Sequence, residues 1–127
     1  MQVLFEAIRA RWLNQGKLGL TELYNTEAQT NAVFPYGVVS LPSNVPGEGE
    51  FEVDTEDCLI QFNLFSDKTL ATEVCEAFEA LKLAFDQHDL AVAGYEPISM
   101  LREPANLIRV EKIWQYTVTY ALLIQKT

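Results

Sequence analysis

Apolar side chains recur every three or four positions in two parts of the chain, a spacing typical of amphipathic helices. In the first part, from Gln2 to about Asn14, the residues Leu4, Ile8 and Trp12 share one helical face. Gly16 follows shortly afterwards and is expected to end the helix. The pattern therefore predicts an N-terminal helix with one apolar face to bury.

A second and longer helix is predicted from Lys68 to His88. Asp67 precedes it as a candidate N-cap, a position where a carboxylate accepts a hydrogen bond from a free backbone N–H. Charged residues occupy the positions that would face solvent. The apolar positions of this helix are Leu70, Val74, Phe78, Leu81 and Phe85.

Strands are predicted in the middle of the chain. Apolar and polar residues alternate from Glu56 to Asp67, which is the period of a half-buried strand. The apolar run at 34–41 predicts another strand, which Pro42 closes. Residues 42–49, rich in proline and glycine, are expected to form a loop, and residues 17–31 a long connection.

The last third of the chain predicts two more strands. Residues 90–101 are interrupted at Gly94 and Pro97, which indicates a bend or an edge position. Residues 107–125 alternate aromatic and aliphatic residues with glutamine and threonine, and they are expected to form one long central strand. The order α-β-β-α-β-β predicts a single α+β domain over residues 1–127, with two helices packed on one face of a mainly antiparallel sheet of about four strands.

Acidic residues are concentrated in one stretch of the chain. The 127 residues include 18 Asp and Glu against 9 Lys and Arg, a net charge of −9. No basic residue lies between Lys17 and Lys68, and the acidic residues elsewhere balance the basic ones, so the whole net charge belongs to that stretch. Its acidic residues are Glu22, Glu27, Glu48, Glu50, Glu52, Asp54, Glu56, Asp57 and Asp67. Nucleic-acid binding draws much of its affinity from Lys and Arg, so a DNA-reading role is disfavoured.

The acidic run at 48–57 alternates carboxylates with Phe51 and Val53. It lacks the Asp-x-Asp-x-Asp-Gly order that wraps a calcium ion. Three interpretations stay open: a solvated acidic strand face, an electrostatically functional surface, and a metal site.

The usual supports of catalysis do not occur in the sequence. His88 is the single histidine and is expected to face solvent, and no nucleophile elbow or phosphate-binding loop occurs. Cys58 and Cys75 fall in apolar patterns, where cysteine behaves as a small hydrophobic residue. We expect a protein that is not an enzyme and uses no cofactor or metal. The two cysteines are too few for a disulfide framework, so synthesis in a reducing cytoplasm is expected. No stretch is apolar enough for a membrane span or a standard signal peptide.

Four short sequences carry a resemblance to a known family. They are Leu4-Phe5-Glu6-Ala7-Ile8, Phe34-Pro35-Tyr36-Gly37-Val38-Val39, Ile60-Gln61-Phe62-Asn63-Leu64-Phe65-Ser66-Asp67 and Trp114-Gln115-Tyr116-Thr117-Val118-Thr119-Tyr120. Together with the order of the elements, they resemble the tail-terminator (tail-completion) proteins of long-tailed bacteriophages and prophages. The resemblance spans nearly the whole chain.

The resemblance implies a structural virion protein without catalytic residues. Such a subunit forms a homo-oligomer, a hexameric ring that caps the tail tube and joins it to the head connector. Its partners would be copies of itself, the tail-tube protein and the head-connector or neck protein, with no membrane. It would be located in the phage tail or neck after synthesis in the bacterial cytoplasm. DNA would pass without specific binding, because carboxylates that face the lumen of the ring would repel its phosphates.

Candidate interface residues come from the loop after Leu41 and from the acidic run, because loops on a rigid scaffold often carry contacts. They are Pro42, Asn44, Pro46, Glu48, Glu50, Glu52 and Asp54. Two alternatives stay open for the function. One is a head-closure or connector-adaptor protein of the phage neck, and the other is a small-ligand-binding α+β regulatory module whose helix and aromatic strand line a pocket.

Overall fold

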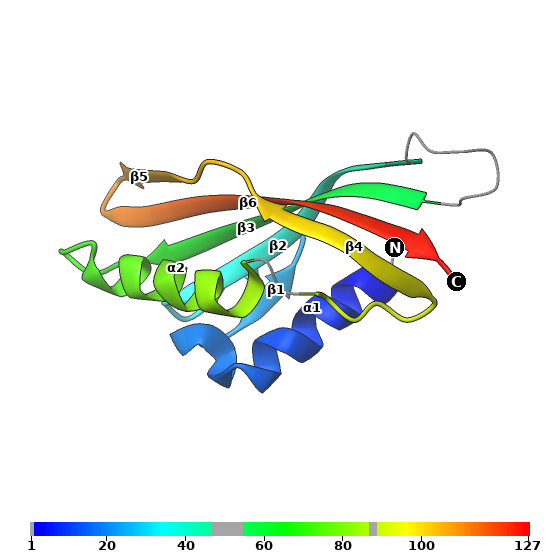
Figure 1. The fold of residues 1–127 in the computed structure, drawn as a ribbon. Helices are drawn as coiled ribbons and strands as arrows, with labels where there is room; N and C mark the ends of the chain where they lie inside the picture. The colour runs from blue at the N-terminus through cyan, green and yellow to red at the C-terminus, as the bar shows by residue number, and fades with distance from the viewer. Residues whose placement is uncertain (1, 47–54, 87–88) are drawn as a thin grey trace.

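A computed structural model describes residues 2–46, 55–86 and 89–127 of the chain. Its helices and strands follow the order α-β-β-β-α-β-β-β, with a short 3-10 helix, η1, after the first helix. The elements are α1 (Gln2–Asn14), η1 (Gly16–Gly19), β1 (Leu23–Asn25), β2 (Tyr36–Pro46), β3 (Thr55–Ser66), α2 (Thr72–Phe85), β4 (Tyr95–Arg102), β5 (Asn106–Val110) and β6 (Ile113–Lys126). Both helices lie on the same side of one sheet (Figure 1).

The six strands form one mixed sheet in the order β1-β2-β3-β6-β4, with β5 also paired to β6. The central strands β3 and β6 run antiparallel from Thr55 opposite Gln125 to Ser66 opposite Trp114. β2 is antiparallel to β3, whereas the short β1 is parallel to β2. β4 and β5 pair with successive parts of the outer side of β6. The sheet therefore has two different edges, which we call the β1–β2 edge and the β4–β5 edge.

The core lies between the helices and one face of this sheet. Even-numbered positions of β3 from Cys58 onward, and of β6 from Val118 onward, are buried and face the helices. Covering each large apolar side chain of this kind stabilises the fold by about 1.5–3 kcal/mol. The helices contribute Leu4, Ile8, Trp12, Val74, Ala77, Phe78, Leu81, Ala84 and Phe85 to this layer.

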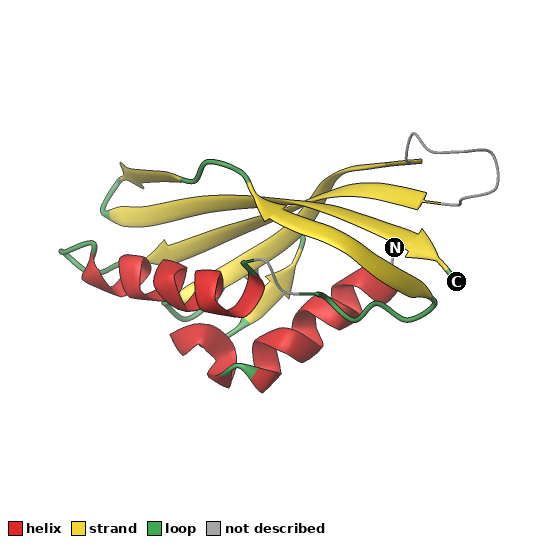
Figure 2. Ribbon diagram, viewed as in Figure 1, coloured by secondary structure: helices red, strands yellow, loops and turns green. Residues whose placement is uncertain are grey.

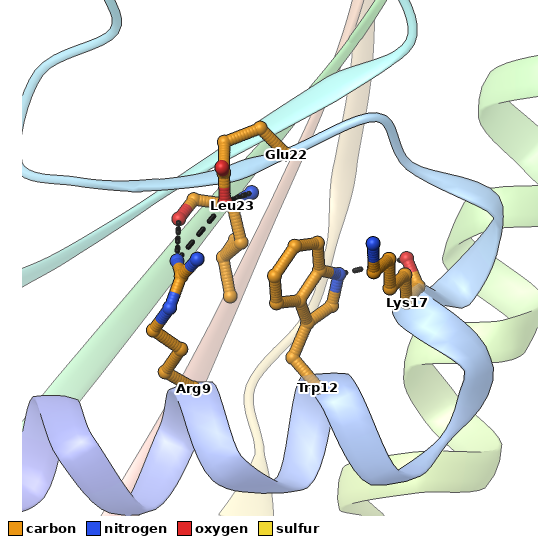
Figure 3. Close-up of polar contacts among 5 residues, drawn as sticks. All are labelled: Arg9, Trp12, Lys17, Glu22 and Leu23. Carbon is orange, nitrogen blue, oxygen red and sulfur yellow. Dashed lines mark hydrogen bonds and ion pairs between the residues drawn. The ribbon is translucent and has the colours of Figure 1, made fainter.

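Polar contacts hold α1 against the start of β1 (Figure 3). Arg9 Nη1 donates to Glu22 Oε1 at 2.9 Å and to the Leu23 carbonyl at 3.2 Å, and the Leu23 N–H donates to the same carboxylate at 3.0 Å. Trp12 Nε1 donates to the Lys17 carbonyl at 2.7 Å. Partial burial opposes the charge of Glu22, but the hydrogen bonds from Arg9 and the Leu23 N–H outweigh it, so its pKa lies below the ordinary value.

A second group of contacts fixes the end of α2. The Tyr120 hydroxyl donates to Asp86 Oδ1 at 2.5 Å, and Arg102 Nε donates to both oxygens of the same carboxylate at 3.1 and 3.2 Å. Arg11 of α1 donates to the Ala84 carbonyl in the last turn of α2. Burial, and then the bond to Asp86, raise the pKa of Tyr120. The ends of both helices are thus tied to each other and to β6.

The prediction of about four strands in the order α-β-β-α-β-β is wrong. β1 was missed because it is three residues long and lies in a polar stretch. Residues 107–125 form a hairpin of β5 and β6 instead of one strand. The chain reverses at Glu111 and Lys112, which have φ angles of 50° and 74°. Such turns favour Asn-Gly, so a Glu-Lys pair gave no turn signal.

The loop expected at 42–49 is also corrected, because β2 continues to Pro46. Its prolines are tolerated there because β1 pairs with β2 only at residues 37–39, which leaves the later part of β2 on the edge of the sheet. The register also shifts between Ser40 and Ser43, beside Pro42. The strand predicted over residues 90–101 begins only at Tyr95, so Gly94 lies in a turn before the strand and does not interrupt it. The edge position and the irregularity expected at Pro97 are confirmed, because β4 is an edge strand whose register shifts after Pro97.

Helix α2 begins at Thr72, four residues later than predicted from Lys68. Asp67 is not its N-cap; Ala71 occupies that position and makes no side-chain cap. The intervening segment is held by other contacts instead, because Arg109 Nη1 donates to the Thr69 carbonyl at 2.6 Å. The predicted end of this helix at His88 lies outside the described residues.

Candidate assembly surface

The sheet surface opposite the two helices, which we call the open face, is the candidate surface for assembly. Both helices lie on the other side of the sheet (Figure 2). Along β3 and β6, positions of the open face are half-buried by their neighbours, and they alternate with the buried core positions. The pairing register shows that three groups of side chains follow one another across this face.

An aromatic cluster lies at the β1–β2 edge. We use this name for Tyr24, Phe34, Tyr36 and Phe65. The Tyr36 ring is 5.8 Å from Tyr24, 5.1 Å from Phe34 and 5.0 Å from Phe65 between centroids. Aromatic pairs at such distances attract each other beyond simple burial. Burial, followed by the neighbouring Tyr24, raises the pKa of Tyr36, so the Tyr36 hydroxyl is uncharged at neutral pH.

A polar belt occupies the middle of the open face. Gln115 Nε2 donates to Asn63 Oδ1 at 3.0 Å, and Thr117 Oγ1 donates to the same oxygen at 2.8 Å. These bonds cross from β6 to β3 and fix the amide of Asn63. The belt consists of Ser40, Gln61, Asn63, Gln115, Thr117 and Thr119.

An aliphatic rim follows the β4–β5 edge. We use this name for four residues whose side chains are exposed: Ile98 at 47%, Leu101 at 58%, Ile108 at 40% and Val110 at 56%. They make up half of the large hydrophobic residues that are exposed in the described part of the chain. An edge strand with exposed apolar side chains is a surface on which another chain can pack.

Charge is nearly absent from the open face. Of the described strand residues that the register places there, only Asp57 and Glu96 are charged, and none is basic. Arg102 of β4 and Arg109 of β5 lie on the helix side, where they contact Asp86 and the Thr69 carbonyl. Among the described strand residues, the open face therefore has no cationic group that could bind a phosphate.

The interface residues predicted from the sequence are only partly described. Pro42 and Asn44 are exposed on β2, and Pro46 ends that strand. They lie on the β1–β2 edge, close to the position where Ser43 pairs with Leu59. The four acidic residues predicted with them, Glu48, Glu50, Glu52 and Asp54, lie outside the described residues, as does His88.

The aliphatic rim was missed because its residues were assigned to other features. Ile108 and Val110 belonged to the predicted long central strand, where they would have been covered on both sides. A turn at Glu111 was the missing signal, since it moves both residues to an edge.

The cysteines have no arrangement that suggests chemistry. Cys58 is fully buried in β3, and burial, together with Glu56 and Asp57, raises its pKa to about 11. A thiol with that pKa is a poor nucleophile near neutral pH. Across residues 2–46, 55–86 and 89–127, no group of three or more His, Cys, Asp or Glu side chains could hold a metal ion. Over the same residues, no helix is long and apolar enough to cross a membrane.

A groove lies between α1 and the β1–β2 edge, and Arg9 is among its charged residues. Phe5, Arg9, Leu23, Asn25 and Val39 are among the residues that line it. Arg9 is already paired with the Glu22 carboxylate, so its charge is used within the fold.

Comparison with known proteins identifies a shared fold. No protein-family model matches the chain, and no curated protein matches it in sequence. A solved chain from the virion of a native gene transfer agent (GTA) particle superposes with a TM-score of 0.74 over 96% of this chain and 91% of that one. The two sequences are 15% identical, so the likeness concerns the fold.

Proposed function

We propose that this chain is a structural protein of a phage-like virion, and specifically a tail terminator that forms a ring, caps the tail tube and joins it to the head connector. The observation that carries the proposal is the fold shared with a virion chain over nearly the full length of both proteins. A gene transfer agent particle is phage-like, and the sequence resemblance to tail terminators points to the same class of assembly.

The surfaces of the chain are consistent with assembly. A sheet with one face free of helices and two unlike edges offers separate contacts to different neighbours. Rings arise when a surface on one copy meets a different surface on the next copy and the rotation closes. Only the family resemblance supports the proposed number of six subunits.

The composition of the open face is also consistent with the passage of DNA through the ring. If this face lines the channel, DNA can slide along it, because no described Lys or Arg side chain there can pair with a phosphate. A test is to place lysines at Gln61 and Thr119 in the polar belt. We expect these variants to retain DNA in binding assays at low salt and to release it as salt rises, whereas the unmodified chain should not bind.

The proposal is tested by deleting the gene from the genome that encodes the chain and examining the particles by electron microscopy. Tails of uncontrolled length that carry no heads are the expected result for a tail terminator. Tails of normal length beside separate, leaking heads would instead identify the head-closure or adaptor role. Intact particles of normal shape would contradict both.

A further inference from the structure

The two edges of the sheet are unlike in chemistry: one carries exposed aliphatic side chains, and the other carries half-buried aromatic side chains. The β4–β5 edge has the aliphatic rim. The β1–β2 edge has the aromatic cluster, with Val33 beside it at 65% exposure. The two edges therefore present different surfaces to a second copy.

The two groups lie at the same level of the sheet. Tyr36 is opposite Phe65, Phe65 is opposite Gln115, and Gln115 is opposite Ile108. The aromatic cluster and Ile108 are thus the two ends of one row of paired residues. A second copy placed beside the first by continuing the sheet would bring its aromatic cluster next to Ile108 and Val110.

A second row gives the same correspondence. Leu101 is opposite Ala121, Ala121 is opposite Leu59, and Leu59 is opposite Ser43 on β2. Ser43 lies between Pro42 and Asn44, two residues that the sequence had suggested for the interface. The same placement of a second copy would bring Leu101 against this part of the β1–β2 edge.

The charges of the two halves of the sheet are also complementary. The strands β1, β2 and β3 come from the stretch between Lys17 and Lys68, which has no basic residue. Its acidic residues within the described part are Glu22, Glu27, Glu56, Asp57 and Asp67. The half formed by β4, β5 and β6 has four basic residues, Arg102, Arg109, Lys112 and Lys126, against three acidic ones, Glu96, Glu103 and Glu111. Two acidic β1–β3 halves would repel each other, whereas the nearly neutral β4–β6 half would not repel an acidic one.

We propose that copies of this chain associate head to tail, with the aliphatic rim of one copy packed against the aromatic cluster and the Pro42 segment of the next. The partner is a second copy of the chain. This contact deepens the proposed function, on which it rests for its place in a ring, and it names the two surfaces that meet. A contact between two different surfaces leaves one of each free at the ends of an open chain, so only ring closure satisfies every copy.

The test uses two variants that each lose one edge. Val33→Lys/Pro42→Lys alters exposed residues of the β1–β2 edge, and Leu101→Asp/Ile108→Asp alters exposed residues of the aliphatic rim. The matched control is Leu83→Asp, because Leu83 is 78% exposed and belongs to α2, which lies on the helix side of the sheet (Figure 1) and is part of neither edge strand. Circular dichroism melts establish that each variant folds. A double variant that does not fold is replaced by its single substitutions. Light scattering after size-exclusion chromatography then measures mass.

We expect the unmodified chain and Leu83→Asp to form the same multi-subunit species, and each edge variant alone to stay at the 14.4 kDa of one copy. An equimolar mixture of the two edge variants should form a dimer and nothing larger, because each variant retains the edge that the other has lost. Contact between like edges would give no such rescue.

Several results would overturn the contact. They are an edge variant that keeps the mass of the unmodified chain, a mixture of folded variants that stays monomeric, and an unmodified chain that is monomeric at every concentration. If either edge variant still forms rings, the proposed ring is retained but the proposed contact is refuted. If the gene deletion leaves normal particles, the proposed function fails whatever the masses show.

Discussion

Replacing Tyr120 with phenylalanine removes one hydroxyl from the place where the end of α2 meets β6. Tyr120 is fully buried, and its ring lies 6.0 Å from Phe62 and 6.2 Å from Phe85 between centroids. Phenylalanine keeps these ring contacts, so the substitution isolates the hydrogen bond to Asp86. The expected result is a lower free energy of unfolding without a change of fold.

The magnitude follows from what remains after the hydroxyl is lost. A hydrogen bond to a charged group contributes about 1.5–3 kcal/mol. The Asp86 side chain is 32% exposed and keeps its two contacts with Arg102, so water and the guanidinium compensate for part of the loss. We therefore expect the lower end of that range, about 1.5 kcal/mol.

Urea unfolding at several pH values measures this effect. The pKa of Tyr120 is raised in the folded protein, whereas a tyrosine in the unfolded chain has a pKa of about 10. The stabilisation is complete below that pH and is lost as pH rises towards the folded pKa. Phenylalanine has no proton to lose, so the difference between the unmodified chain and Tyr120→Phe should narrow above about pH 10.

Tyr116→Phe is the matched control. Tyr116 is in the same strand and stacks on Phe78 at 4.1 Å between centroids, and no described residue makes a side-chain hydrogen bond to its hydroxyl. Its substitution should change the free energy of unfolding by no more than about 0.5 kcal/mol. Equal losses for the two variants, or a loss for Tyr120→Phe that does not change with pH, would refute the reasoning.

Three further experiments, two substitutions and one labelling reaction, test the packing of the core. Gly37→Ala should cost about 1–3 kcal/mol in urea unfolding, because the new Cβ would lie 3.0 Å from a Leu23 methyl group; an unchanged midpoint would show that the leucines move aside freely. Trp12→Phe should cost about 1 kcal/mol, because the Lys17 carbonyl loses the indole N–H and keeps only the Leu20 N–H as a donor. A neutral result in the same assay would argue against the indole bond. Cys58, with its pKa of about 11, should resist maleimide in the native protein at about pH 8 and react after denaturation. Mass spectrometry of labelled peptides measures this, and labelling of native Cys58 would contradict the expectation.

Local periodicity predicted the elements that carry a strong repeat. The N-terminal helix was predicted to within a residue or two, and the alternation around Phe62 identified β3, because both patterns are set by one buried face. The predictions failed where tertiary pairing decides the outcome. β1 exists because its three residues pair with β2, and β2 passes Pro42 because its outer edge needs no partner there.

The candidate surface was harder to predict than the core for the same reason. Exposure of Ile108 depends on the turn at Glu111, which carries no glycine or asparagine to mark it. Once the hairpin is known, the pairing register alone connects Ile108 with Tyr36 and Leu101 with Ser43 across the sheet. The concentration of acidic residues was visible in the sequence, but its relation to one half of the sheet required the strand order.

The position of the chain in a particle is the most direct test of the central claim. Thr127 is exposed at the end of the chain, so a short affinity tag placed there can be labelled with gold on intact particles. Electron microscopy should show the label where the tail meets the head, in a small and constant number of copies. Label along the whole tail, on the capsid surface or on no particle would contradict the proposed role.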